Sequence, residues 1–338
     1  MGCGRSLTQF WVKLRAMAHT RYAEGAGSTA VEQMMIRVFP FVVFSSFLFA
    51  QENDGRVLPA DQALHVLAFG DFGSGAPVQA QTARAMARCH EQQPFNLGIT
   101  MGDNFYRCGV RGVDDPKWKS RWENLYTPLG IPFYATLGNH DYGHPPVICP
   151  AERGSPDAEV AYSKKSKSWH MPARYYSFKA GPVLFVAIDT EGWSRKQLEW
   201  IRTTLEESTG DPEIKWRIVY GHHPIYTSGV HLNERRIGEL REELLPVLKS
   251  AKVDAYICGH DHDMEHVRAD GMDFFICGGG GARLRQFHGT KPGTVFRHVS
   301  YGFLDLRIDQ STMSVQYFDS KLNPLEDPMP VRTHSPTN

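Results

Sequence analysis

The sequence predicts an α/β fold in which most strands run parallel. Two patterns predict it. Apolar strand-like runs alternate with helix-like stretches from His65 onward, and a polar turn that contains glycine follows each of the first three strands. Strand-helix-strand units close in a right-handed crossover, so a succession of them favours a mainly parallel sheet. The chain has 338 residues, is 41% hydrophobic and carries no formal net charge. This composition is typical of a soluble globular protein, and it gives no reason to expect nucleic acid as a partner.

The expected elements follow in order along the chain. The first half contains a strand, a helix, a strand, a helical stretch and a strand, at residues 65–69, 78–91, 95–101, 115–126 and 132–137. Residues 142–179 interrupt this alternation of strands and helices with Pro-rich and Gly-containing stretches, and we expect a long loop there that faces substrate. Strands and helices then alternate again, at 183–190, 194–207, 216–220, 234–249, 253–258 and 274–277. Two alternating runs, 301–308 and 313–318, predict an antiparallel pair.

Residues 1–58 contain few strand-like patterns, unlike the rest of the chain, and are expected to be a leader. An apolar run over residues 38–50 follows Arg37 and ends in Ala50 before polar residues, which is the layout of a secretory signal peptide at about residues 34–50. The run is short for a membrane span, and its internal position suggests a translation start at Met34 or Met35. A buried hairpin and an uncleaved anchor stay open as alternatives. The signal peptide predicts a secreted protein, extracellular or periplasmic, with no stable membrane insertion after cleavage. After the leader we expect one folded domain at 59–325 and a tail at 326–338.

Side chains of the metal-ligand type follow five apolar strands, at the point where each strand ends. They are Asp71, Asp103 with Tyr106, Asn139 with His140, His222, and His260 with His262. Loops that leave parallel strands converge on one crevice, so we expect these side chains to meet. A single strand-end Asp is more often a helix cap, but five such groups in succession favour a metal site. Carboxylates, imidazoles and a phenolate suit iron, manganese or zinc better than calcium or magnesium.

Five cysteines follow the expected leader, and an odd number in an exported protein indicates at least one free thiol. Cys108 and Cys149 lie in loops that leave strand ends beside the expected site, so they are the expected disulfide. Cys258 and Cys277 lie in apolar strands and are expected to be small core residues.

The ligand set resembles the metallophosphoesterase superfamily and, within it, the purple acid phosphatases of the small tartrate-resistant type. The resemblance covers roughly residues 64 to 320 and is carried by five blocks, Gly70–Gly73, Gly102–Tyr106, Gly138–Asp141, Val219–His222 and Gly259–His262. It implies a four-layer α/β/β/α sandwich, with two mixed sheets flanked by helices, and makes 59–325 a catalytic domain.

The resemblance also implies a dinuclear centre of Fe(III) and a divalent ion, which would be Fe, Zn or Mn. The implied Fe(III) ligands are Asp71, Asp103, Tyr106 and His262. The implied ligands of the divalent ion are Asn139, His222 and His260, with Asp103 bridging the two ions. Most metallophosphoesterases have a His where this chain has Gly73, and Tyr106 supplies the missing ligand. A phenolate is a hard anionic donor that stabilises Fe(III).

The implied activity is that of an acid phosphatase, which hydrolyses phosphate monoesters by attack of a metal-bound hydroxide. We expect His140 to assist the leaving group, Asp141 to orient His140, and His231 to be a second proton donor or a phosphate contact. Arg283 and Arg285 are further candidates for contact with substrate. The expected partners are small phosphate esters, and the protein is expected to be a monomer. Two alternatives stay open: a phosphodiesterase or nucleotide phosphohydrolase on the same site, and a non-catalytic metal-binding or redox protein.

Overall fold

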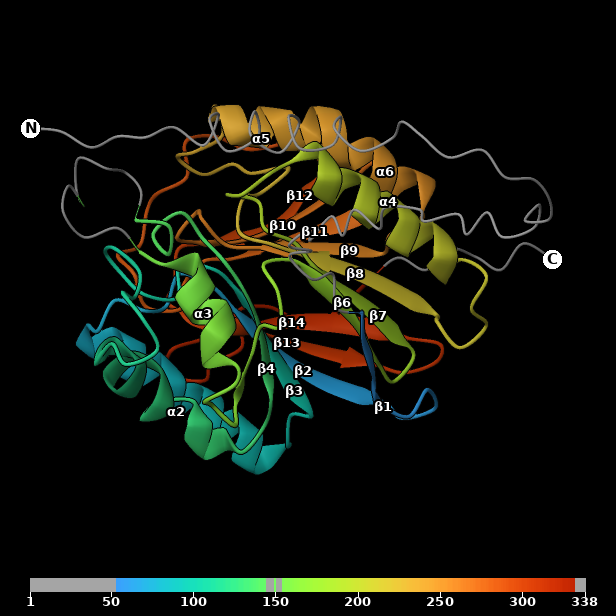
Figure 1. The fold of residues 1–338 in the computed structure, drawn as a ribbon. Helices are drawn as coiled ribbons and strands as arrows, with labels where there is room; N and C mark the ends of the chain where they lie inside the picture. Colours follow the sequence, from blue (N-terminus) through green and yellow to red (C-terminus); the bar gives the residue numbers. More distant parts are fainter. Residues whose placement is uncertain (1–52, 144–148, 150–153, 332–338) are drawn as a thin grey trace, which may run out of the picture. The chain divides into compact units, whose positions relative to one another are not determined.

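The computed structural model describes residues 53–143, 149 and 154–331, which form two mixed sheets with helices on their outer faces (Figure 1). The first sheet has eight strands in the order β1-β6-β7-β8-β9-β11-β10-β12. Their bounds are β1 Asn53–Leu58, β6 Tyr176–Ala180, β7 Val183–Ala187, β8 Trp216–Tyr220, β9 Ala255–Cys258, β10 Met264–Ala269, β11 Met272–Cys277 and β12 Thr294–His298.

The second sheet has seven strands in the order β15-β14-β13-β2-β3-β4-β5. Their bounds are β2 Leu64–Phe69, β3 Leu97–Met101, β4 Phe133–Thr136, β5 Trp169–His170, β13 Gly302–Ile308, β14 Met313–Asp319 and β15 Met329–Pro330. Strands β13 and β14 form the predicted antiparallel pair. They extend the parallel part of the sheet, because β13 also pairs with β2.

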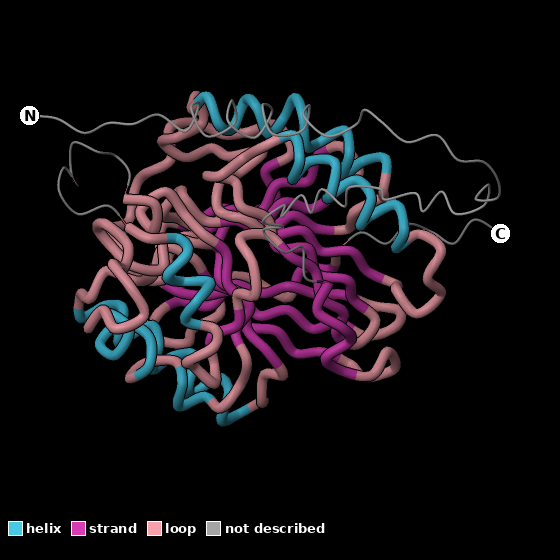
Figure 2. The backbone as a smooth tube through the Cα atoms, viewed as in Figure 1, coloured by secondary structure: helices cyan, strands magenta, loops and turns pink. Residues whose placement is uncertain are grey.

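Helices cover the outer face of each sheet, and Figure 2 shows the two strand layers between them. Helix α2 (Pro77–Gln92) packs on the second sheet, whereas α4 (Arg195–Ser208), α5 (Arg235–Glu239) and α6 (Leu245–Ser250) lie over the first. The shorter helices are η1 Trp118–Glu123, η2 Thr127–Leu129, α3 Pro156–Tyr162 and η3 Leu240–Leu244. The four-layer α/β/β/α arrangement is therefore confirmed, whereas the single mainly parallel sheet is replaced by two mixed ones.

Hydrophobic burial holds these layers together. Ile201 and Leu205 of α4 are fully buried against strands of the first sheet, at the spacing that places side chains on one helix face. Phe69 of the second sheet and Phe185 of the first belong to the core between the sheets. Burying a side chain of this size contributes about 1.5–3 kcal/mol to stability.

The strand register brings the ligand-bearing loops to one edge. Strands β2, β3 and β4 pair in parallel, and so do β7, β8 and β9, so the strands of each set end on the same side. A backbone bond from Gly70 N–H to the Cys277 carbonyl, 2.9 Å long, joins the end of β2 to the end of β11 in the other sheet. The loops from both sheets therefore converge.

Several local expectations were wrong. Residues 142–179, expected as loop, contain α3, β5 and all but the last residue of β6, and the helical stretch 115–126 is reduced to η1 and part of the turn before η2. Strands β10 and β12 were not expected, and β1 and β15 add strands within the segments expected as leader and tail. The expected signal peptide lies outside the described residues. Among those that are described, no helix combines the length and apolar character needed to cross a membrane.

Candidate metal centre

Three of the predicted ligands stand on strained backbone. The φ angles are +56° at Asp71, +52° at Asp103 and +69° at His260, all in the left-handed region. This region costs a residue with a side chain roughly 1–2 kcal/mol, and such strain clusters at functional sites. Hydrogen bonds from backbone N–H groups hold it in place: Asp71 N–H donates to the Gly102 carbonyl at 3.0 Å, and His260 N–H donates to the carboxylate oxygen Oδ2 of Asp71 at 2.9 Å.

The close approach of two loops explains why residue 73 is a glycine. A Cβ atom on Gly73 would lie 1.7 Å from the carbonyl oxygen of Asn104, so no side chain fits there. The same approach lets Tyr106 N–H donate to the Gly73 carbonyl at 2.9 Å. The chain thus excludes a histidine ligand at position 73 and places Tyr106 beside it.

The predicted Fe(III) ligands converge on one hydroxyl. The Tyr106 oxygen lies 2.8 Å from Asp103 Oδ2, 3.1 Å from Asp71 Oδ1 and 3.1 Å from His262 Nε2. Burial raises the pKa of Tyr106 well above its ordinary value, and the charges of Asp103 and Asp71 raise it further. Two carboxylates and a phenolate at these distances repel one another, so a highly charged cation is what would allow all three to be ionised.

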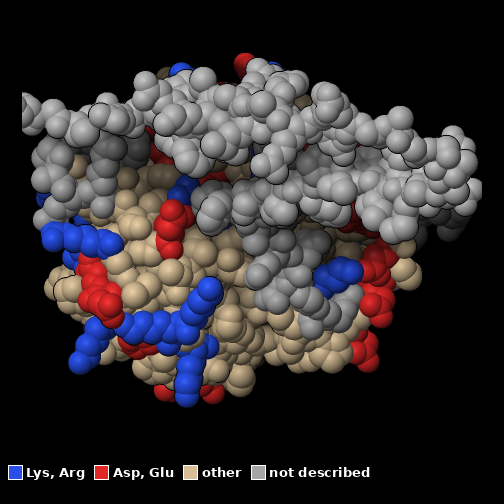
Figure 3. All heavy atoms as spheres, in the orientation of Figure 1, with Lys and Arg blue, Asp and Glu red and all other residues tan. Residues whose placement is uncertain are grey.

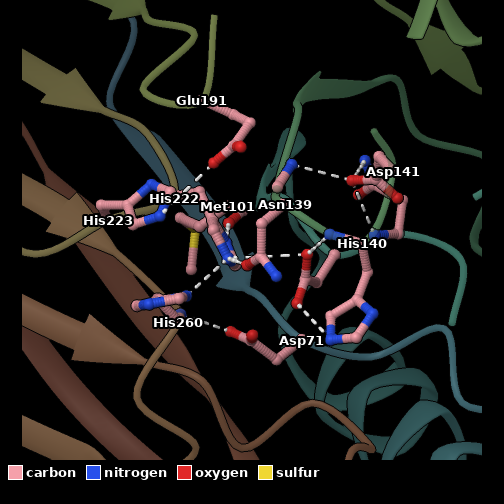
Figure 4. Close-up of polar contacts among 12 residues, drawn as sticks. Asp71, Met101, Asn139, His140, Asp141, Glu191, His222, His223 and His260 are labelled. Carbon is pink, nitrogen blue, oxygen red and sulfur yellow. Dashed lines mark hydrogen bonds and ion pairs between the residues drawn. The ribbon is translucent and has the colours of Figure 1, made fainter. Parts of the chain in front are cut away.

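The predicted ligands of the divalent ion lie on the other side of Asp103. His222 Nε2 is 3.0 Å from Asn139 Oδ1, 3.5 Å from Asp103 Oδ1 and 3.1 Å from His260 Nδ1. Figure 4 shows Asp71, Asn139, His222 and His260 directed toward a common space. Asp103 therefore presents Oδ2 to the tyrosine side and Oδ1 to the histidine side, as a bridging carboxylate would. Ligand atoms of Asp71, Asp103 and His222 all lie within 4.8 Å of one another.

All three predicted histidine ligands have their outer ring nitrogen held by an acceptor. His222 Nδ1 is 2.8 Å from the Met101 carbonyl, and His262 Nδ1 is 2.7 Å from the Arg283 carbonyl. His260 Nε2 is 2.8 Å from the Glu234 carboxylate. Each acceptor favours a proton on the nitrogen that faces it, which leaves the lone pair of the other nitrogen for the ligand cluster. This arrangement is usual for histidines that bind metals, so the residues fit a metal centre.

Electrostatic effects favour, for two of these groups, the protonation state that binds metal. Burial lowers the pKa of His260 well below its ordinary value, with His223 and His222 adding to the effect, so the imidazole stays neutral. Burial works to raise the pKa of Asp103, but His222 and His140 outweigh it and the pKa is lowered. A neutral imidazole and an ionised carboxylate are the states that bind metal.

His140 lies at the rim of the cluster. Its backbone N–H donates to Asp103 Oδ1 at 2.8 Å, and its ring Nδ1 is 2.5 Å from the Arg107 carbonyl. The other ring nitrogen, Nε2, is 4.0 Å from Asp103 Oδ2, and the side chain is 14% exposed. His140 therefore stands between the ligands and solvent.

Asp141 does not contact the ring of His140, as a directly orienting carboxylate would. Its carboxylate accepts bonds from Gly138 N–H at 2.8 Å, Phe105 N–H at 3.0 Å, and the backbone and side-chain nitrogens of Asn104 at 3.1 Å each. It thus joins the loop of Asp103 to the turn of Asn139. Burial and the charge of Asp103 raise the pKa of Asp141 to about 7.

His231 lies beside the divalent side, with its ring centroid 4.1 Å from that of His260. Its Nδ1 is 2.7 Å from Asp261 Oδ1, and its Nε2 is 2.6 Å from Arg285 Nη1. Both ring nitrogens are therefore engaged.

Two further residues of the site were not predicted. Glu234, the partner of His260, lies in the loop before α5 and belongs to no recognisable motif; a carboxylate three residues after His231 was its only signal. His223 is the second of these residues: it is buried, with its ring centroid 4.3 Å from that of His260. Its Nε2 lies 3.6 Å from Glu191.

The predicted disulfide is confirmed: Cys108 and Cys149 are joined. Cys108 follows Arg107, whose carbonyl contacts His140, so the bond fastens a loop at the rim of the site. Cys89, Cys258 and Cys277 are free and buried, which confirms the expectation of an unpaired thiol.

Comparison with known proteins agrees with the geometry. The family model described as calcineurin-like phosphoesterase matches residues 64–264. Purple acid phosphatase 4 of Arabidopsis thaliana is 30% identical over 293 residues, which are 78% of this chain and 83% of that protein. Tartrate-resistant acid phosphatase type 5 of Rattus norvegicus is 27% identical over 301 residues, 76% of this chain and 87% of that protein.

Among solved structures, GAP50, an anchor in the inner membrane complex of Plasmodium, superposes with a TM-score of 0.70 at 24% identity. The match covers 80% of this chain and 89% of GAP50. At this level of identity, the similarity shows the fold alone.

Proposed function

Because the chain belongs to the calcineurin-like phosphoesterase family and is similar to purple acid phosphatases over most of its length, we propose that it hydrolyses phosphate monoesters at a dinuclear Fe(III)-divalent metal centre. Phosphate ester hydrolysis is the activity of the family, and the monoester preference and the metals are our proposal. The observation that carries it is the position of Asp103, whose two oxygens face two separate sets of ligands.

The ligand sets would divide as follows. Fe(III) would be held by Asp71, Asp103, Tyr106 and His262, and the divalent Fe, Zn or Mn by Asp103, Asn139, His222 and His260. When bound, the two ions would supply the Lewis acidity and positive charge that activate water and stabilise the transferred phosphoryl group, and we therefore predict an acidic working range.

His140 is the proposed proton donor to the leaving group. The Arg107 carbonyl, 2.5 Å from Nδ1, can only accept a hydrogen bond, so it fixes a proton on Nδ1 and orients the ring. Nε2 is then the atom that would pass a proton to the departing oxygen. Asp141 would act as a positioning residue, because it joins the two loops that carry Asp103 and His140.

His231 keeps its proposed role at the divalent side, as a second proton donor or a phosphate contact. Its Nε2 accepts from Arg285. To donate a proton from that atom, His231 would have to be protonated and separate from Arg285.

The test compares turnover of 4-nitrophenyl phosphate with that of bis(4-nitrophenyl) phosphate, before and after removal of metal by a chelator. The proposal predicts faster turnover of the monoester and loss of turnover in the chelated protein. Faster turnover of the diester would favour the phosphodiesterase alternative. Full metal occupancy with no turnover of either ester would favour a non-catalytic protein.

We also propose that the protein is exported. Two observations support this: the signal-peptide layout of residues 34–50, and the Cys108–Cys149 disulfide, a bond that persists in oxidising compartments. Determination of the amino terminus of the protein collected from the medium or periplasm tests it, and an uncleaved amino terminus inside cells would contradict it.

A further inference from the structure

We propose that Arg285 forms an anion-binding site beside the metal centre, which selects phosphate monoesters whose leaving group carries a second negative charge. The inference rests on the proposed function for the position of the phosphoryl group. It adds the chemical class of the substrate.

The position of Arg285 is fixed by two contacts. Its backbone N–H donates to the His262 carbonyl at 3.2 Å, and its guanidinium Nη1 donates to His231 Nε2 at 2.6 Å. His262 is a proposed ligand of Fe(III), and the ring of His231 packs on that of His260, a proposed ligand of the divalent ion. The guanidinium therefore lies beside the divalent half of the centre, and the backbone of Arg285 is tied to a ligand of the Fe(III) half, but Arg285 belongs to neither ligand set.

The partner of Arg285 is a neutral group. An arginine can only donate, so His231 Nε2 accepts and the imidazole carries its proton on Nδ1, toward Asp261. Burial raises the pKa of Glu234 and Arg285 partly opposes this rise, but the Glu234 carboxylate bonds to His260. Within residues 53–143, 149 and 154–331, no carboxylate forms an ion pair with Arg285. Asp263 is a second buried carboxyl, and Arg285 opposes the rise in its pKa without forming an ion pair with it, so the guanidinium keeps N–H donors for an anion from solution.

The segment around Arg285, residues 283–298, is also positively charged. Residues 283–298 contain no Asp or Glu, in a chain whose formal net charge is zero. The cations and histidines of this segment are Arg283, Arg285, Lys291, Arg297, His288 and His298. Acidic and basic side chains are mixed on the face shown in Figure 3, so an excess of one sign is not a general property of this surface.

The segment also provides space. Gln286 and Phe287, which follow Arg285, line an open hollow of about 480 Å³ together with Arg297 and His298. The Arg297 guanidinium lies over the Phe287 ring, 5.2 Å from its centroid. Arg285 itself does not line this hollow, which places further positive charge at the surface next to Arg285 in the sequence.

A row of basic side chains on a surface is more often simply solvated. Arg285 differs because it is only partly exposed and is bonded to an imidazole of the site. When the phosphoryl group lies on the metal ions, an anionic group on the leaving-group side gains attraction from Arg285, whereas a neutral leaving group gains none.

The test uses two substrates that differ in one group. Glycerol 3-phosphate and 3-phosphoglycerate have similar alcohol leaving groups, but the second carries a carboxylate in place of a hydroxymethyl group. We expect the metal-loaded wild type to prefer 3-phosphoglycerate by about tenfold in kcat/KM at low ionic strength, and the preference to shrink as salt is added. Arg285→Gln should reduce the preference to within about twofold, and Arg285→Lys should retain part of it, because charge is the operative property.

Arg202→Gln is the matched control. Arg202 is an exposed residue of α4 whose guanidinium lies 3.5 Å from Glu199, so its loss should leave the preference unchanged. A wild type without preference, or an Arg285→Gln variant that keeps the full preference, overturns the inference.

A binding measurement separates this inference from the proposed function. Isothermal titration of metal-loaded protein with 3-phosphonopropionate and with propylphosphonate needs no turnover. Tighter binding of 3-phosphonopropionate that is lost in Arg285→Gln supports the anion site even if the protein hydrolyses neither ester. Equal binding of the two phosphonates by the wild type overturns the anion site even if hydrolysis is fast.

Discussion

The Nε2 atom of His260 lies 2.8 Å from the carboxylate of Glu234, and the Nδ1 atom of the same ring faces His222. Glu234 therefore decides which nitrogen of His260 is free to bind the divalent ion. Glu234→Ala should weaken binding of that ion by about 10–100-fold and leave the Fe(III) side intact. Titration of the divalent metal followed by elemental analysis measures this, with Glu199→Ala, on the exposed face of α4, as control. Unchanged affinity in Glu234→Ala would refute the role given to this contact.

His140 contacts two of the proposed ligands, Asp103 through its backbone N–H and Tyr106 through its ring, with 4.4 Å between the ring centroids, but it supplies no ligand atom itself. His140→Ala should therefore keep the metal content of the wild type and lower kcat by about 10²–10⁴-fold, the usual loss on removal of a general acid. Arg202→Ala, at an exposed position of α4, should change neither quantity. If turnover survives in His140→Ala, the proton reaches the leaving group from elsewhere.

Asp141 accepts four hydrogen bonds from two loops while fully buried. Asp141→Ala would leave buried donors unpaired, and we expect a loss of roughly 2–4 kcal/mol in the free energy of unfolding together with weaker metal binding. Urea unfolding of the metal-free protein measures the first effect apart from the second. A variant of wild-type stability would show that water or neighbouring groups replace these bonds.

The disulfide between Cys108 and Cys149 closes a loop with a sequence separation of 41 residues. Replacing both cysteines by serine should lower the free energy of unfolding by about 3–4 kcal/mol, as the entropy of loop closure predicts. The change should also lower kcat, because the neighbouring Arg107 carbonyl orients His140. Metal content should stay unchanged, and lost metal binding would mean that the bond supports the ligand loops themselves.

Burial raises the pKa of Asp254 to about 7, with its bond from Arg217 N–H acting in the opposite direction. A carboxyl group with a raised pKa binds more protons in the folded than in the unfolded state. Its contribution to stability is therefore complete below pH 4 and is lost as the pH rises to about 7, and it amounts to at most about 4 kcal/mol. Asp254→Asn should flatten the fall in stability between pH 4 and 7, measured by urea unfolding of chelated protein. An unaltered slope would show that other groups cause the fall.

The sequence predicted the structure best where an apolar run is followed directly by a residue of the metal-ligand type. Each apolar strand that ends in Gly and a ligand-type side chain could be located, because the strand shows as a run of apolar residues and the ligand as a polar residue directly after it. Strand β10 was missed for the opposite reason. Its polar residues Glu265 and His266 are buried and paired, with Ser228 and Asp273, so the strand does not look apolar.

Long-range contacts account for the rest. Nothing near Glu234 in the sequence shows that it meets His260, and nothing near Asp141 shows that its bonds go to Asn104 and Phe105. Helix α3 did leave a signal: Ser155, whose side chain accepts from Ala158 N–H, precedes Pro156 at the first helical turn. The helix was not predicted, because the Gly and Pro residues around its start are also typical of loops.

The visible absorption spectrum of the iron-loaded protein, recorded for the wild type beside Tyr106→Phe, tests the central claim most directly. The Tyr106 oxygen lies within 3.1 Å of Asp103, Asp71 and His262, so Fe(III) bound by this set would carry a phenolate ligand. The account predicts a broad phenolate-to-Fe(III) charge-transfer band in the wild type and its disappearance in Tyr106→Phe. A colourless wild type with full metal occupancy, or a band that persists in Tyr106→Phe, would contradict it.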